Sequence, residues 1–256
     1  MTATVQELSS YFSSIQAKLL GDDGVALLRG GWVPLAIVNA STFECSENGA
    51  IYVSATSLKV IGDITSYVQI GTRVKLTDNS TTKYFAVASA SYSSPYTTIT
   101  FIPSTDYALA GGTPTNLYFS QKDDPIGFPA VFNYTPSSFT GFSATPSAAF
   151  YLWSITASGW VTVTVYISGL GTSDATSFQL KAPIKAKDMT GAASCAWGCV
   201  PWSASDNGAA LTTPTQAVIV ENTDDIILSA SISGAGGLWT NANGKGANFD
   251  LRYPAR

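Results

Sequence analysis

The chain has no histidine among its 256 residues. This absence excludes a Ser-His-Asp triad, a Cys-His nucleophile pair and every zinc site that needs an imidazole ligand. An enzyme built on this sequence would have to work with carboxylates, tyrosine or lysine.

Charge is also scarce. Charged residues make up 12% of the chain, about half of the roughly 25% that is usual for soluble domains. The net charge is −4, and no segment clusters lysine and arginine, so the basic surface that binds phosphate backbones is missing. We therefore expect no nucleic-acid partner.

Cysteines are few, and long apolar runs are missing. Three cysteines do not indicate a disulfide framework, although Cys195 and Cys199 are close enough in sequence that a pairing stays open. No segment approaches the roughly 20 apolar residues that cross a bilayer, and the first residues lack the pattern of a secretory signal. We expect a chain that starts near Met1, is made in a reducing cytoplasm and does not insert into a membrane.

The first 31 residues predict a short helix. Its apolar residues recur at spacings of three and four, the seam of a coiled coil: Val5, Leu8, Phe12, Ile15 and Leu19. A helix this short is marginal alone in water, so the seam needs a partner. Residues 1–31 are interpreted as an anchoring or oligomerisation segment, and packing of the helix on its own chain is the alternative.

From Trp32 onward the apolar period changes to two, which predicts strands. The strands expected in a middle module, residues 32–122, are 32–39, 51–53, 73–77, 82–91, 97–102 and 116–120. Polar turns at 78–80 and 93–95 join them into a meander. We expect a small β-barrel or sandwich.

Residues 122–125 form the best candidate linker, and a second module, residues 123–256, follows it. Its expected strands are 130–134, 147–156, 159–168, 177–181, 190–200, 215–220, 226–233 and 248–253. The segment 156–159 predicts a hairpin turn that brings Trp153 and Trp160 to the same end. The fold class is therefore all-β, with a jelly-roll-like antiparallel sandwich at the C-terminus.

Motifs in the middle module resemble a known family. GTRVKLT at 71–77 is followed by TKYFAV at 82–87, SYSSP at 91–95 and STDYAL at 104–109. This order resembles a β module of tailed-bacteriophage tail and fibre proteins. The resemblance carries no catalytic motif.

The distal module has a second set of motifs. GFS at 141–143 precedes VTVTVYISG at 161–169, GTSDATSFQL at 171–180 and Pro183. This set is similar to C-terminal β modules of phage fibre-like appendages, except that Asp174 stands where asparagine is usual. The two resemblances cover about two-thirds of the chain.

The resemblance implies a structural component of a tailed-phage virion: a trimeric tail fibre, or a baseplate or tail-tip appendage. It implies a homotrimer that joins other virion proteins through the N-terminal segment, in a particle assembled from proteins made in the host cytoplasm. A head fibre or capsid decoration protein is one alternative. A module that binds host-surface glycans is the other.

Glycan contact would use exposed aromatic rings with amides and carboxylates beside them. The candidates are Trp197, Trp202, Asp206, Asn207 and Trp239, which lie in glycine- and serine-rich stretches. Packing within the core or between subunits is the competing interpretation of each ring. On this basis we expect the distal module, and not the middle one, to meet a host.

Acidic doublets at 22–23, 123–124 and 224–225 are the only sequence feature that suggests carboxylate chemistry. A glycosidase needs two carboxyl groups at set separations, and adjacent residues in turns are more often solvated. No spacing fits an EF-hand. We therefore expect no catalytic residue, no metal site and no cofactor, and we interpret the protein as non-enzymatic.

Overall fold

The computed structural model describes residues 31–34, 37–38, 45–46, 50–143, 145–146, 149–171, 176–189, 195–211, 215–230, 239–241 and 244–255. Within these ranges the chain forms twenty β-strands and no helix, so the predicted all-β fold class is confirmed there. No helix long and apolar enough to cross a membrane occurs in the same ranges. The predicted N-terminal helix, with Val5, Leu8, Phe12, Ile15 and Leu19, lies outside the described residues.

The chain divides into two compact units. Unit 1 comprises residues 1–99 and 109–128, and unit 2 comprises residues 100–108 and 129–256. This division differs from a boundary at 122, because the segment after it packs in unit 1. The Trp32 indole N–H donates to the Ile126 carbonyl over 2.8 Å, and the Phe128 ring lies against the Trp32 ring.

Residues 100–108 belong with unit 2 for an equally local reason. The Trp153 indole N–H donates to the Pro103 carbonyl over 3.0 Å. The backbone N–H of Thr105 donates to the Asn133 carbonyl over 2.8 Å. These bonds hold the segment within unit 2, although its first two residues end β8 (Tyr96–Phe101), a strand of the unit 1 sheet.

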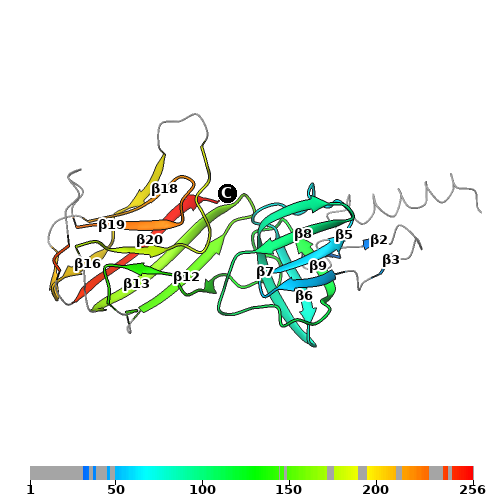
Figure 1. Ribbon diagram of the computed structural model, residues 1–256, viewed down its shortest axis with the longest axis horizontal. Helices are drawn as coiled ribbons and strands as arrows, with labels where there is room; N and C mark the ends of the chain where they lie inside the picture. Colours follow the sequence, from blue (N-terminus) through cyan, green and yellow to red (C-terminus); the bar gives the residue numbers. More distant parts are fainter. Residues whose placement is uncertain are drawn as a thin grey trace, which may run out of the picture. The chain divides into compact units, whose positions relative to one another are not determined.

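Unit 1 is built on one seven-stranded sheet in the order β1-β9-β6-β7-β8-β5-β4, which curls on itself (Figure 1). Its strands are β1 (Val33–Pro34), β4 (Ala50–Ser54), β5 (Ser57–Ile61), β6 (Arg73–Asp78), β7 (Thr81–Ser93), β8 (Tyr96–Phe101) and β9 (Thr115–Ser120). β2 (Ile37–Val38) and β3 (Cys45–Ser46) pair separately. Most of these strands match the sequence prediction; β5 was not expected.

The β6–β7 hairpin shows why the sheet has two different faces. Asn79 and Ser80 both have positive φ, 47° and 63°, which fits the right-handed twist of a two-residue hairpin turn. The resulting register pairs Val74 with Phe85, both buried in the core. Alternate residues of β6 therefore point to the opposite face of the sheet.

Unit 2 contains two antiparallel sheets that form the predicted β-sandwich. The six-stranded sheet runs β10 (Phe132–Asn133), β12 (Ala149–Ile155), β13 (Trp160–Gly171), β20 (Lys245–Pro254), β16 (Ser203–Asp206) and β17 (Ala209–Ala210). The five-stranded sheet runs β11 (Phe139–Thr140), β14 (Gln179–Lys181), β19 (Asp225–Ser229), β18 (Gln216–Val220) and β15 (Ala196–Cys199).

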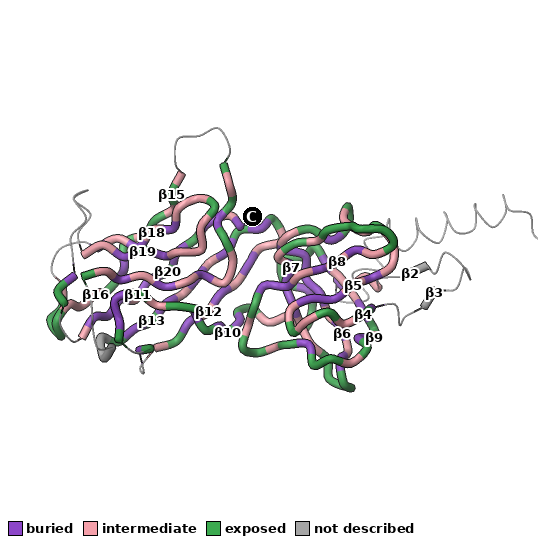
Figure 2. Tube along the Cα trace, in the orientation of Figure 1, coloured by how far each residue is buried: buried purple, intermediate pink, exposed green. Residues whose placement is uncertain are grey.

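The core of unit 2 follows from strict alternation along the central strands. Buried side chains recur at every second position of β13 and β20: Val161, Val163, Val165, Ile167, Phe249, Leu251 and Tyr253. The five-stranded sheet adds Ile219, Ile226 and Leu228. Figure 2 shows these buried stretches alternating with less buried ones along β13 and β20.

The predicted turn at 156–159 joins β12 to β13. The backbone N–H of Trp160 donates to Thr156 Oγ1 over 3.0 Å, and Thr156 donates back to the Trp160 carbonyl. The two flanking tryptophans do not share a face. Trp153 is buried against Phe132, whereas Trp160 is exposed and lies under the Arg252 guanidinium.

Candidate functional site

Trp239 does not serve as an exposed glycan contact, contrary to the sequence prediction. Only 1% of it is exposed. Its indole N–H donates to the Leu228 carbonyl over 2.9 Å, and its ring meets Phe178 with centroids 5.0 Å apart. The glycine-rich flank suggested a loop, but the ring itself fills the sandwich core.

The other four glycan candidates do not lie on one loop. Trp197 is a half-buried residue of β15 in the five-stranded sheet, whereas Trp202 precedes β16 of the six-stranded sheet and is 60% exposed. The Asp206 carboxylate accepts hydrogen bonds from the backbone N–H and hydroxyl of Thr240. Asn207 is exposed in the turn that follows. Trp202 and Asn207 therefore stay available to a ligand, but separately.

The outward face of the six-stranded sheet carries an aromatic pair that the sequence did not single out. Phe150 on β12 faces Tyr166 on β13. Their rings are stacked, with centroids 4.9 Å apart and planes within 2°, and the residues are 47% and 37% exposed. Tyr166 pairs in turn with Asn248 of β20, whose carbonyl accepts from the backbone N–H of Trp202.

Cys195 and Cys199 are both free thiols. Cys195 directly precedes β15 and Cys199 ends it, so an extended strand separates the two sulfurs and the pairing left open by the sequence does not form. Burial, with a smaller contribution from the charge of Asp250, raises the pKa of the Cys199 thiol to about 11.

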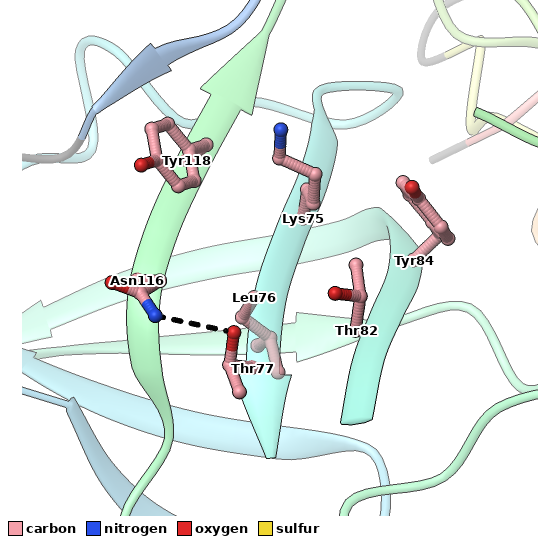
Figure 3. Close-up of a pocket in the computed structure, with 7 residues that line it drawn as sticks. All are labelled: Lys75, Leu76, Thr77, Thr82, Tyr84, Asn116 and Tyr118. Atoms are coloured by element: carbon pink, nitrogen blue, oxygen red, sulfur yellow. Dashed lines mark hydrogen bonds between the residues drawn. The ribbon is translucent and has the colours of Figure 1, made fainter. Parts of the chain in front are cut away.

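A hollow of about 410 Å³ lies on the outward face of the unit 1 sheet (Figure 3). It falls within the size range of small-molecule sites. Seven residues from three adjacent strands line it: Lys75, Leu76, Thr77, Thr82, Tyr84, Asn116 and Tyr118. We refer to it as the β6 hollow, because β6 runs along its middle.

Strand register explains why these residues meet. Lys75 of β6 pairs with Tyr84 of β7 on one side and with Tyr118 of β9 on the other. Thr77 pairs in the same way with Thr82 on β7. Two cross-strand rows result, one of a lysine between two tyrosines and one of hydroxyl groups.

Lys75 has an unusual environment for a lysine on a sheet surface. Its ammonium lies 4.5 Å from the centre of the Tyr118 ring and 4.9 Å from that of the Trp32 ring. Burial lowers its pKa below the ordinary lysine value. Among the described ion pairs, none joins Lys75 to a carboxylate.

The next row along β6 shows the contrast. Arg73 is buried, and its guanidinium meets Asp123 at 3.4 Å and faces the Phe128 ring at 5.4 Å. The segment containing Asp123 and Phe128 thus supplies a carboxylate and an aromatic ring that contact the Arg73 guanidinium. Lys75, one row farther along the same face, has aromatic neighbours but is in no ion pair among the described residues.

The polar end of the β6 hollow is held by Asn116. Its φ is 50°, a conformation that asparagine adopts more readily than most residues, and it lies at a register shift between β6 and β9. The Asn116 amide donates to the Thr77 hydroxyl over 3.3 Å. The β6 hollow therefore offers one cation, two aromatic flanks and several neutral hydrogen-bonding groups.

No family model, curated protein or solved structure matches this chain. Its function must therefore be argued from its own residues and surfaces.

The sequence prediction missed the β6 hollow, although part of the signal was present. GTRVKLT places Lys75 and Thr77 on the face opposite Val74 and Leu76. What the sequence does not contain is the strand order that brings Tyr118 beside β6. The strand positions alone could have suggested a lysine flanked by polar residues, but not by these rings.

Proposed function

We propose that this chain is a non-enzymatic structural component of a tailed-phage virion, a trimeric tail fibre or a baseplate or tail-tip appendage. The observation that carries the proposal is the exposed Phe150–Tyr166 pair on the outer face of a rigid sandwich. Large rings exposed side by side on a sheet mark a surface that contacts another macromolecule. In a virion appendage that macromolecule is a second copy of the chain or a neighbouring virion protein.

The low charge of the chain supports the same role. Charged residues amount to 12%, and a surface of uncharged polar groups and rings can be covered without burying unpaired ions. Near the aromatic pair, Asn248 follows this pattern by donating to the Ser203 hydroxyl, and the Asp250 carboxylate, which is the exception, accepts a hydrogen bond from the Thr164 hydroxyl. Assembly between copies would therefore cost little electrostatic free energy.

Three of the quoted phage-like motifs add support because they coincide with regular structure. GTRVKLT ends in β6, TKYFAV lies in β7, and VTVTVYISG lies in β13, the central strand of the sandwich. These three motifs are thus strands of β modules and not catalytic loops, as expected for a structural family. SYSSP at 91–95 and STDYAL at 104–109 lie partly or wholly outside the strands.

A host-glycan binding module is the second candidate. The β6 hollow favours it, because tyrosine flanks and neutral hydrogen-bonding groups gather in one concave place. The two functions are compatible, since an appendage that holds the particle together can also touch a host surface. A head fibre or decoration protein would differ only in where the chain attaches.

The proposal is tested by asking whether the chain is part of the particle. Particles produced from the genome that encodes it, purified by density gradient, should contain the chain by immunoblot. Replacing Phe150 and Tyr166 together with serine should lower incorporation by about tenfold. Serine at Ile51 and Val53, which are similarly exposed on β4 of unit 1, is the matched control and should incorporate normally.

Two results would overturn the proposal. Wild-type particles that lack the chain would reject the virion role. Normal incorporation of the Phe150→Ser, Tyr166→Ser variant would show that the aromatic pair is not an assembly surface.

A further inference from the structure

We propose that the β6 hollow binds a carboxylated sugar, such as a uronic acid residue of an acidic polysaccharide. The binding is argued from unit 1 alone, and its use in host attachment rests on the proposed function. It moves the expected glycan contact from the distal module to the middle one.

The charge of Lys75 points to an anion. The described ion pairs join Arg73 to Asp123, Lys83 to Asp78, and Lys181 to Asp224 and Asp225, and Lys75 is in none of them. Lys75 is half-buried between rings, and none of these described carboxylates reaches it. A ligand carboxylate would supply a charge-assisted hydrogen bond to a partly desolvated ammonium, which is stronger than a neutral one.

The rings on either side of Lys75 point to a sugar. Tyr84 and Tyr118 are half-buried, so part of each ring stays open to the β6 hollow. Figure 3 shows Lys75 on the middle strand with one tyrosine on each neighbouring strand. The apolar C–H face of a sugar can pack on amphipathic rings of this kind, and this contact removes water from apolar surface.

The hydroxyl row completes the match. Thr77, Thr82 and Asn116 lie one row away from Lys75, on the same face. Their donors and acceptors can bond sugar hydroxyls while the carboxylate meets Lys75. An inorganic phosphate or a nucleic-acid backbone fits less well, because such sites gather several cations or backbone N–H donors and the β6 hollow has one lysine.

The test uses the purified full chain and two ligands with the same sugar backbone, tetragalacturonate and its fully methyl-esterified form, of which only the first is charged. Isothermal titration calorimetry and ligand-observed NMR should show that the acid binds about tenfold more tightly than the ester. The acid should also lose affinity as salt is raised, because screening weakens the ion pair.

Substitutions locate the binding. Lys75→Met keeps an unbranched side chain that is shorter by one atom and should weaken acid binding by about tenfold while changing ester binding much less. Lys59→Met removes the same charge from β5, outside the β6 hollow, and should change neither. Asn116→Asp suits the positive φ of that residue and should weaken acid binding more than ester binding, because the new carboxylate repels only the acid.

Equal affinity for acid and ester, no binding of either, or unchanged acid binding by Lys75→Met would each overturn the proposal. Circular dichroism verifies that each variant is folded. If Lys75→Met does not fold, Asn116→Asp tests whether the acid binds in the β6 hollow. Acid binding by a chain that is missing from particles would keep the ligand and reject the virion role. A chain that is present in particles but binds no acidic sugar would keep the virion role and reject the ligand.

Discussion

The Lys75 ammonium lies 4.5 Å from the centre of the Tyr118 ring, and strand register pairs the same two residues across β6 and β9. The contact is therefore built into the backbone of unit 1 and does not depend on a flexible loop. Because the Trp32 ring lies 4.9 Å from the same ammonium, the ammonium is held between two rings before any ligand arrives. A preorganised cation of this kind loses little conformational entropy on binding.

Gly141 should tolerate no side chain. Its φ is 95°, and a Cβ there would lie 1.9 Å from the Ser177 carbonyl oxygen. We expect Gly141→Ala to lower the free energy of unfolding of unit 2 by more than about 3 kcal/mol, because a backbone atom has to move. Gly208→Ala is the control: its φ is also positive, at 74°, but nothing lies within 4 Å, so it should cost about 1 kcal/mol. Urea unfolding measures both, and equal costs would contradict the close approach.

Alanine at Trp239 should lower the stability of the protein, whereas alanine at Trp202 should not. Trp239→Ala removes a buried ring and should cost about 3–5 kcal/mol of stability, whereas the exposed Trp202→Ala should stay within about 0.5 kcal/mol. Thermal unfolding separates them. Trp202 is thus the variant with which to ask whether the distal module also contacts a host, since reduced adsorption of its particles would not reflect misfolding.

Asp78 should make unit 1 sensitive to acid. Its side chain is buried and accepts hydrogen bonds of 2.8 Å from Lys83 and from the backbone N–H of Ala110. Desolvation raises the pKa of Asp78, but these two bonds and the Lys83 charge outweigh it, so the pKa is lowered.

For a carboxylate with a lowered folded-state pKa, the added stability is present above the unfolded value, about 3.9. It is lost as pH falls through the folded-state value. We expect the unfolding free energy measured in urea to fall below about pH 4, with a shallower dependence in Asp78→Asn. At pH 7 this variant should be less stable by about 3 kcal/mol. The exposed Asp124→Asn is the control, and an equally shallow curve in it would contradict the assignment to Asp78.

The Cys199 thiol should alkylate slowly. With a pKa of about 11, the reactive thiolate is a small fraction at pH 8, and the rate should rise about tenfold per pH unit toward 11. Iodoacetamide labelling read by peptide mass spectrometry measures the rate at this cysteine. In urea-unfolded chain the same peptide should label far faster, and similar rates in both states would show that burial does not protect the thiol.

Trimerisation through the first residues stays a prediction that the described residues do not reach. Light scattering of the full chain should give about three times the 26.8 kDa protomer mass. Replacing Leu8, Phe12 and Ile15 with serine should return it to the protomer mass and leave the β circular dichroism signal intact. Loss of the β signal would instead mean that the segment packs on its own chain.

The strands were the most predictable part of the fold. In β13, alternation of Val161, Val163 and Val165 with threonines fixes which face is buried, because the side-chain period of a strand is two. β5 was missed, since only two of its five residues, Leu58 and Val60, are both apolar and buried. A segment that short gives too few repeats to count.

The site was less predictable because it depends on strand order. Tyr118 and Lys75 become neighbours only when β9 pairs with β6, a long-range choice made by the packing of the whole sheet. The prediction for Trp239 was wrong for the converse reason. Its neighbours in sequence suggest a loop, but its ring is buried in the sandwich core. Neither the strand pairing nor the burial of a ring follows from the residue type and the composition of the neighbouring sequence.

The central claim is that the chain is a structural part of a virion, and electron microscopy of intact particles tests it most directly. Gold-labelled antibodies raised against the purified chain should bind wild-type particles at a fixed location on the tail. Particles carrying Phe150→Ser and Tyr166→Ser should show little label there. Intact wild-type particles that bind no label, while the antibody recognises the free chain in the same lysate, would contradict the account.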